Sequence, residues 1–341
     1  MLALLLAAVL VPESADVVLS VEDASGLQAL LRKAGTHAPS LAPEAVGATL
    51  RDRLGVDLLA ESPAWGLAQR GARTVAFSRQ AMGLSAPVRD AGAAKRMLAS
   101  WLAQGPHRAG RVAGSRLLTA SGEEAAALLK SMSRPVPLPR DLAARAKGPV
   151  WLWARAAEPL RGMMLSIEAS GAGIVGQGVV TASGALLSGR APTGCANGIA
   201  CLRAGPGPAG RRLFALALEK LEATAQPELA TAVRVEERVD AIDVRELAQS
   251  RSLTRALRIA AVFDAPEAAA PALDARVDLA AIDAALATIN PLDALRGGVV
   301  AGAYAAHILY GPLFRNAGPL TVSGNPQRGG AAEIEVRLPL R

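Results

Sequence analysis

The chain has 341 residues, of which 51% are hydrophobic and 20% charged, and its formal net charge is +7. This composition excludes a disordered protein and supplies enough apolar material for two domains or one large one. The positive charge comes from 32 Arg and 5 Lys. Because no run of Lys or Arg is interleaved with aromatic residues, nucleic acid is not an expected partner.

The first eleven residues, Met1 to Val11, form an uncharged apolar run. A helix of this length covers roughly 16 Å, so it cannot span a bilayer core of about 30 Å, and no transmembrane span is expected in the mature protein. The run is typical of the hydrophobic part of an export signal, although no Lys or Arg precedes it. Residues 1–14 are therefore interpreted as a signal-like segment, with a candidate cleavage point after Ala15. The alternative is a buried first strand from Leu4 to Val11.

An N-terminal α+β module is expected over residues 15–132, in which short strands alternate with amphipathic helices. The alternation of apolar residues in Asp16–Val21 predicts a half-buried strand. Ser25 and Gln28 form a capping-box pattern that predicts a helix from Gly26 to Ala34. Further predicted elements are helices Pro43–Leu54 and Pro63–Gln69, a helix from the N-cap Asp90 to Gln104, a strand over Gly114–Ala120, and a helix that Ser121 and Glu124 cap and that ends at Met132.

Residues 133–148 are predicted to be a Pro-rich linker with a short helix, because Pro135, Pro137 and Pro139 interrupt both helix and strand pairing. A second α+β module is expected over residues 149–341. Its predicted strands are 149–156, 162–169, 173–181, 232–241, 255–264, 319–323 and 332–340. Its predicted helices are 210–223, 280–289, 291–295 and 298–310. The fold class is therefore α+β, with two modules of mixed, largely antiparallel sheets packed with amphipathic helices.

A glycine pattern that occurs in dinucleotide-binding proteins, G-x-G-x-x-G, spans Gly171–Gly176. Phosphate binding there would need a helix that opens at the loop, but the following residues are strand-like. The acidic residue that would hold the ribose is also missing, because no Asp or Glu lies between Glu168 and Glu219. The segment is interpreted as a turn between two strands, and no cofactor is expected.

Catalytic and metal-binding patterns are sparse. The three histidines, His37, His107 and His307, have no metal-ligand spacing, and no G-x-S-x-G motif marks a nucleophilic serine. One acidic cluster could be imagined as an acid/base pair, but Arg residues interleave with it, which favours a solvated, salt-bridged strand face. The cluster comprises Glu236, Glu237, Asp240, Asp243 and Glu246, with Arg234, Arg238 and Arg245 between them. No catalytic or metal residue is assigned.

The two cysteines, Cys195 and Cys201, are separated by five residues. In an oxidising compartment they would close a local disulfide, which the loop-entropy argument makes worth roughly 2 kcal/mol. Two free thiols and a redox or metal pair remain as alternatives, although the spacing differs from the C-x-x-C of redox proteins.

An uncharged segment extends over the eighteen residues from Gly297 to Phe314. Gly311-Pro312 is predicted to end its helix after Tyr310, which leaves too few residues to span a membrane. The segment is interpreted as a buried helix, with an apolar ligand groove or membrane association as alternatives. The groove would involve Gly298, Gly302, Tyr304, His307 and Tyr310.

The stretch from Pro12 to Asp23, with Leu27, Leu30 and Leu31 after it, places a strand before an acidic residue and a helix, and Val88-Arg89-Asp90 repeats this arrangement. In these features the chain resembles a broad group of uncharacterised exported bacterial proteins built from recurrent strand-helix modules. The resemblance covers about the first third of the chain and implies a periplasmic or surface-facing protein without an established activity.

These patterns together favour an exported protein of the periplasm or cell envelope, with a cytoplasmic protein as the alternative. We expect a binding or scaffolding module and not an enzyme, whose partner is an apolar small molecule or an envelope protein. A divergent hydrolase that uses distant residues such as His37, His107 or His307 is one alternative. A structural component of envelope assembly is another.

Overall fold

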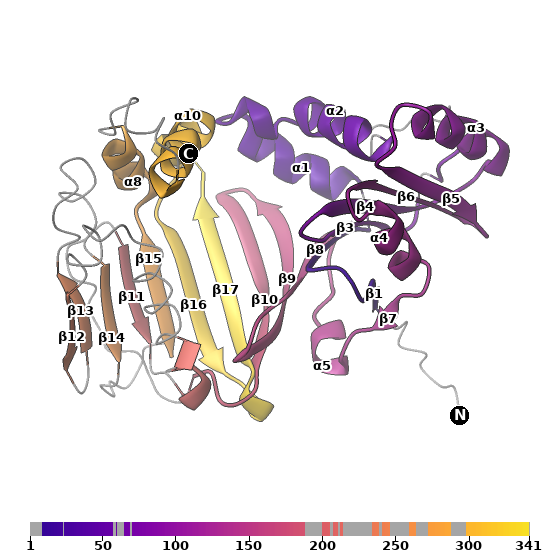
Figure 1. Cartoon of the computed structure of the whole chain (residues 1–341). Helices are drawn as coiled ribbons and strands as arrows, with labels where there is room; N and C mark the ends of the chain where they lie inside the picture. The colour runs from indigo at the N-terminus through magenta and orange to yellow at the C-terminus, as the bar shows by residue number, and fades with distance from the viewer. Residues whose placement is uncertain are drawn as a thin grey trace. The chain divides into compact units, whose positions relative to one another are not determined.

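The computed structural model describes residues 9–22, 24–56, 59, 65–68, 70–187, 200–204, 207–210, 212–213, 234–238, 241–245, 259–263, 272–287 and 298–340. It confirms the α+β class, with helices packed on largely antiparallel sheets (Figure 1). The chain divides into two compact units. The first comprises Met1–Gly35, Pro39–Ala156 and Gly162–Ala169, and the second Thr36–Ala38, Ala157–Arg161 and Ser170–Arg341.

The first unit contains an antiparallel sheet in the order β9-β8-β2-β3-β4-β6-β5. Its strands are β2 (Val17–Val21), β3 (Arg73–Phe77), β4 (Ala81–Pro87), β5 (Arg108–Ala113), β6 (Arg116–Gly122), β8 (Val150–Arg155) and most of β9 (Leu160–Ser170). Its helices are α1 (Ala24–Gly35), the 3-10 turn η1 (Pro39–Leu41), α2 (Pro43–Leu54), α3 (Ala91–Leu102), α4 (Ala125–Met132) and α5 (Arg140–Ala143).

Helices cover both faces of this sheet. On one face α2 and α3 bury a cluster formed by Leu54, Val56, Val75, Leu84, Ala86, Leu98, Trp101 and Leu117. Side chains alternate along a strand, so Gly83 of β4 faces the other side, where Leu128 and Met132 of α4 pack close to it. The helix pair α2–α3 thus rests on an apolar core.

Two helix boundaries in this unit follow from local chemistry as expected. The Asp90 carboxylate accepts hydrogen bonds from the backbone N–H groups of Gly92 (2.8 Å) and Ala93 (3.0 Å), so it is the N-cap of α3. Helix α2 has the predicted bounds, with Pro43 in its first turn. It ends where Gly55 adopts a φ of 76°, a left-handed conformation that suits glycine.

The two capping-box predictions are wrong. Helix α1 begins at Ala24, so Ser25 already lies in its first turn. Ser121 belongs to β6, where it pairs with Met82 of β4, and α4 begins only at Ala125. For Ser121 the physical reason is that strand pairing on both sides of β6 continues to the end of the strand and overrides the local capping preference.

The end of the apolar N-terminal run is part of the fold. Strand β1 (Leu10–Val11) pairs antiparallel with β7 (Val136–Pro137), and Val11 is only 2% exposed. The Leu138 N–H also donates to the Val9 carbonyl at 2.9 Å. The predicted linker, residues 133–148, contains β7 and the single helical turn α5. Residues 1–8 of the apolar run lie outside the described part of the chain.

The second unit contains a sheet in the order β12-β13-β14-β11-β15-β16-β17-β10. Among its described pairs β11 and β14 are parallel and the others antiparallel. Its strands are β10 (Gly173–Ala182), β11 (Ala200–Ala204), β12 (Arg234–Arg238), β13 (Ala241–Arg245), β14 (Ile259–Phe263), β15 (Leu273–Val277), β16 (Leu320–Pro326) and β17 (Ala332–Pro339). The helices with described bounds in this unit are α8 (Leu279–Leu286), α10 (Gly298–Asn316) and the 3-10 turn η3 (Arg328–Gly330).

Several predictions for the C-terminal half can be checked. The glycine pattern lies where β9 ends at Ser170 and β10 begins at Gly173, so the turn between two strands is confirmed. The hairpin of β16 and β17 is also confirmed. The strand expected over 232–241 is shorter, because β12 ends at Arg238 and a separate strand, β13, pairs with it. The helix expected over 63–69 is wrong, because Gly66 has a φ of 66° and Leu67 forms an antiparallel bridge with Val88. The helices expected over 210–223 and 291–295 lie mainly outside the described residues.

Candidate functional site at helices α8 and α10

Helices α8 and α10 pack against each other at the connection between two neighbouring strands. β15 leads directly into α8, and α10 leads into β16, which pairs antiparallel with β15 (Figure 1). Asp278 starts α8, since its carboxylate accepts a hydrogen bond from the Ala281 N–H at 3.0 Å. Both helices are rich in Ala and other apolar residues, which lets their backbones approach closely.

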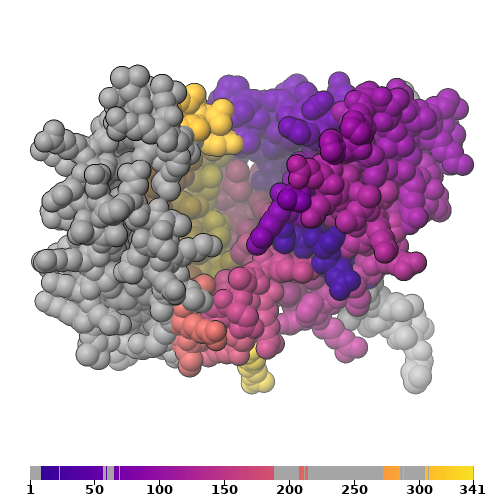
Figure 2. Space-filling view, viewed as in Figure 1, coloured from indigo at the N-terminus to yellow at the C-terminus, as the bar shows by residue number. Residues whose placement is uncertain are grey.

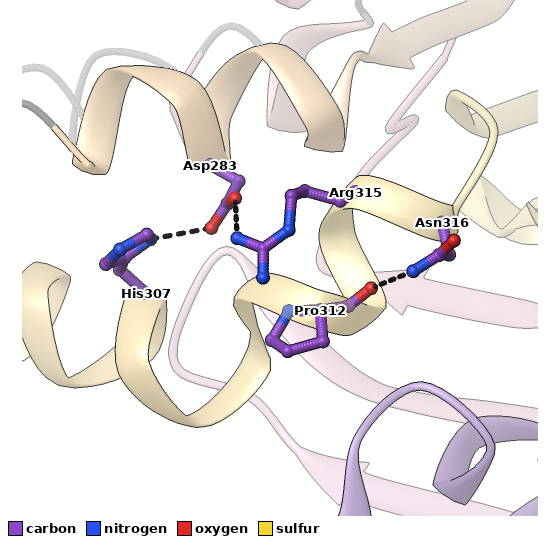
Figure 3. Close-up of polar contacts among 5 residues, drawn as sticks. All are labelled: Asp283, His307, Pro312, Arg315 and Asn316. Atoms are coloured by element: carbon purple, nitrogen blue, oxygen red, sulfur yellow. Dashed lines mark hydrogen bonds and ion pairs between the residues drawn. The ribbon is translucent and has the colours of Figure 1, made fainter.

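A buried carboxylate joins the two helices. Asp283 of α8 is 2% exposed. Its Oδ1 lies 2.7 Å from His307 Nδ1 and its Oδ2 accepts from Arg315 Nη1 at 2.7 Å, both on α10 (Figure 3). An unpaired buried carboxylate would cost several kcal/mol, so both oxygens are satisfied by partners from the facing helix. We call these three residues the Asp283 clamp.

Gly311 provides the space that the Asp283 carboxylate occupies. A Cβ atom at this position would lie only 2.6 Å from Asp283 Oδ1 and 3.3 Å from Arg315 Nη1. Any larger residue would therefore push against a side chain that two hydrogen bonds hold in place. The glycine belongs to the packing between the helices and does not end α10.

The prediction that α10 ends after Tyr310 is wrong, because the helix continues through Pro312 to Asn316. Proline removes one backbone donor from the helix but leaves the following turn intact. That turn is supported from two sides: Asn316 Nδ2 donates to the Pro312 carbonyl at 2.7 Å, and Arg315 is held by Asp283. Among the described residues no helix is long and apolar enough to cross a membrane.

The outer face of α10 is apolar. Ile308 is 59% exposed and Leu309 is 50% exposed, and Ala305 one turn earlier is exposed as well. The exposed Arg315 and Asn316 lie at the end of the same helix. Part of α10 reaches the surface in Figure 2, where it is coloured gold. The clamp thus buries the Asp283 carboxylate, while α10 leaves large aliphatic side chains in solvent.

The sequence-predicted groove residues all belong to α10. Tyr304, His307 and Tyr310 are partly buried, and the rings of Tyr304 and His307 lie 6.4 Å apart at an angle of 43°. Gly298 and Gly302 are described only by their places in the helix backbone. Whether these five residues form an apolar groove stays a prediction.

The other predicted residues lie elsewhere. His37 is in the turn after α1 and is partly buried, whereas His107 is exposed in the turn before β5. Cys195 lies outside the described residues, and Cys201 is described only by its backbone position in β11. In the acidic cluster Glu236 and Glu237 belong to β12 and Asp243 to β13, while Asp240 and Glu246 lie outside the described residues.

Sequence reasoning identified His307 but missed Asp283 and Arg315. A signal for Asp283 was present, since it is the one charged residue in the apolar stretch Leu279–Leu286. A lone carboxylate in the middle of an apolar helix needs a partner. The nearby apolar helix offers few polar side chains, among them His307 and the flanking Arg315.

The Asp283 clamp has two chemical uses. It can lock α8 to α10, and through Nδ1 it can orient the His307 ring and leave Nε2 for another partner. Arg315 shares the same carboxylate, which favours the first use because the Asp283 charge is already paired. In the described part of the chain no three His, Cys, Asp or Glu residues gather where they could hold a metal ion.

No protein-family model matches the chain, and no curated protein matches it. Two solved structures of TP0453, a bacterial protein, show a weak likeness. Crystal form I has a TM-score of 0.32 and 14% identity and covers 52% of this chain and 79% of the TP0453 chain. Crystal form IV has a TM-score of 0.29 and 14% identity, and it covers 49% of this chain and 76% of the TP0453 chain. A likeness at this level carries no argument about function.

Proposed function

We propose that this protein is an exported, non-enzymatic binding or scaffolding module of the cell envelope, and that the outer face of α10 docks an apolar segment of an envelope protein. The observation that carries the proposal is the exposure of Ile308 and Leu309 on one helix face. Large aliphatic side chains placed together in solvent are typical of an interaction surface.

The shape of this surface favours a protein partner. Ala305, Ile308 and Leu309 lie on the exposed side of a helix, whereas small apolar ligands bind in concave sites that enclose most of their surface. The Asp283 clamp supports docking because it fixes α10 on α8 before any partner arrives, which reduces the conformational entropy lost on binding. An apolar ligand bound beside Tyr304, His307 and Tyr310 is the other form of the same proposal.

Photo-crosslinking from α10 in living cells tests the docking face. With a benzophenone amino acid at Leu309, we expect one discrete protein adduct in the envelope fraction. The adduct should disappear when Ile308→Glu is added, because a charge on the apolar face opposes docking. The same crosslinker at exposed Arg111 of β5 is the control. A lipid-only adduct, a self-adduct or no adduct would overturn the proposal.

Export forms a separate part of the proposal, supported by the apolar run Met1 to Val11 and by the resemblance to exported bacterial proteins. Cleavage after Ala15 would remove β1 and its pairing with β7. If a signal is removed there, we therefore expect a mature N-terminus at Asp16 and no β1–β7 pairing in the exported protein. Cell fractionation and N-terminal sequencing of the recovered protein check this. A cytoplasmic location contradicts export, and a mature start before Asp16 contradicts cleavage after Ala15.

A divergent hydrolase is a second candidate, favoured by one observation. Asp283 orients His307 through Nδ1, as an acidic residue does for a general base. Ester, peptide and phosphate substrates should then show turnover that His307→Ala removes, while His107→Ala, a change in an exposed turn, leaves it unchanged. Absence of turnover in the purified protein would exclude this candidate.

A further inference from the structure

A cavity of about 560 Å³ opens between α2 and α3 in the first unit. Its size falls within the usual range for small-molecule sites, about 300–1,000 Å³. The residues that line it come from both helices, from the end of each helix and from Trp65. None of them belongs to the Asp283 clamp.

Two tryptophans and a methionine contribute to the apolar part of the cavity wall. Trp101 is 3% exposed and belongs to the apolar core, so the surrounding core residues hold its ring in place. Trp65 and Met97 pack against the same core and remain partly exposed. The partly exposed Trp65 ring suits a flat aromatic group, which gains both burial and ring stacking.

Gly55 packs directly against the Trp101 ring. It has a φ of 76°, which a side chain rarely adopts, and a Cβ there would lie 2.7–2.9 Å from three atoms of the Trp101 ring. The same residue ends α2, so the helix end and its close packing on the indole depend on one glycine. The way α2 terminates therefore fixes the cavity wall at this point.

The charged residues of the wall favour an anion. Two guanidinium groups, Arg51 and Arg96, line the cavity, against one carboxylate, Asp52. The Arg51 guanidinium lies 5.6 Å from the centre of the Trp65 ring, so charge and aromatic surface occur at the same place. Arginine also binds carboxylate and sulfonate-like groups with paired hydrogen bonds.

We propose that this cavity is a binding site for a small aromatic anion, whose ring packs on Trp65 and Met97 and whose acidic group meets Arg51 and Arg96. Ser100 and Gln104 provide further polar contacts at the edge. The site is independent of the α10 docking face, so either proposal can fail without the other.

Calorimetric titration of the full-length protein tests the site with naphthalene-2-sulfonate as the probe and neutral 2-naphthol as the matched comparison. We expect saturable binding of the sulfonate and clearly weaker binding of the neutral compound. Arg51→Gln should weaken sulfonate binding by about threefold to tenfold, as the loss of a partly solvated charge does. Arg111→Gln on β5 removes an exposed Arg elsewhere and should change nothing.

A bulky side chain should close the cavity without touching the core. Ser100 is exposed on α3, so Ser100→Trp should fold normally and reduce sulfonate binding by at least about tenfold. Ser115→Trp, also at an exposed serine, is the control. Unchanged thermal unfolding of both variants confirms folding. Full binding by folded Ser100→Trp, equal binding of both compounds, or binding lost only in Ile308→Glu would overturn the proposal.

Discussion

The helix pairs α2–α3 and α8–α10 are held together in opposite ways. In the first, Leu54, Leu98 and Trp101 are buried against the sheet, and the polar side chains point outward around a cavity. In the second, a buried carboxylate binds His307 and Arg315, and large aliphatic side chains point outward. The first pair thus buries apolar side chains beneath polar ones, whereas the second buries a carboxylate and exposes aliphatic side chains.

This difference shows where each unit can interact. Polar groups around an aromatic wall suit a small charged ligand, since burial and hydrogen bonds act together there. An apolar helix face suits a larger partner, because it contributes to the free energy of binding only when water is excluded from a wide area. Substitutions in the two helix pairs can test whether the contrast in packing is real.

The largest effect is expected in the apolar pair. Leu54→Ala should lower the free energy of unfolding by about 3 kcal/mol, because Leu54 is fully buried (0% exposed) and the substitution leaves a cavity. Urea unfolding measures the change. Leu102→Ala on α3, at a partly buried position, is the control and should cost clearly less. Equal losses would show that burial does not govern this pair.

A smaller loss is expected when the Asp283 clamp is broken. Asp283→Ala should lower the free energy of unfolding by about 2 kcal/mol. This loss is below the usual range for a buried pair, because the Arg315 side chain is 55% exposed and stays hydrated. Asp283→Asn keeps one acceptor oxygen and should cost less. The control is Asp52→Ala, whose carboxylate is 75% exposed and 3.9 Å from Arg53, with an expected change under about 0.5 kcal/mol. Similar losses for Asp283→Ala and Asp52→Ala would contradict the clamp.

Local patterns allowed much of the fold to be predicted. Apolar alternation located β2, and Pro43 marked the start of α2. Asp90 was recognised as a cap from its place before a helical pattern. These features depend on neighbours within one or two turns, so the local sequence is enough to predict them. Strands such as β3 and β15 were missed because they are specified by pairing with distant strands.

The candidate sites were harder to predict for the same reason. Asp283 meets His307 24 residues later and Arg315 32 residues later, across two helices. No spacing rule within one helix describes such a contact. The cavity also depends on tertiary packing, because Gly55 and Trp101 come together only when α2 and α3 share a sheet face. Gly311-Pro312 was misinterpreted as a helix end since its packing role is invisible in the sequence.

Gly311→Ala tests that role directly. Alanine favours helix over glycine by about 1 kcal/mol, so a purely helical argument predicts stabilisation. We expect destabilisation by about 1–2 kcal/mol instead, because the new Cβ would clash with the Asp283 carboxylate. Gly92→Ala in the first turn of α3 is the control, where a Cβ meets only side-chain atoms at 3.3 Å or more. Stabilisation by both substitutions in urea unfolding would disprove the close approach.

The smallest effect concerns pH and the start of α3. The backbone N–H of Ala93 holds the pKa of Asp90 below its ordinary value, and the Gly92 N–H and Arg96 act in the same direction. A depressed folded pKa means that this stabilisation is fully present above the unfolded pKa, near 4, and is lost as the pH falls through the folded pKa.

Asp90→Asn separates capping from charge, because asparagine caps a helix almost as well but does not titrate in this range. Thermal unfolding of both proteins should therefore show a melting-temperature difference that is constant above about pH 5 and shrinks below pH 4. A difference that stays constant down to pH 2 would mean that Asp90 acts through its hydrogen bonds alone. Since Asn also accepts from the Gly92 and Ala93 N–H groups, any pH-dependent part of the difference reports the carboxylate charge at the first turn of α3.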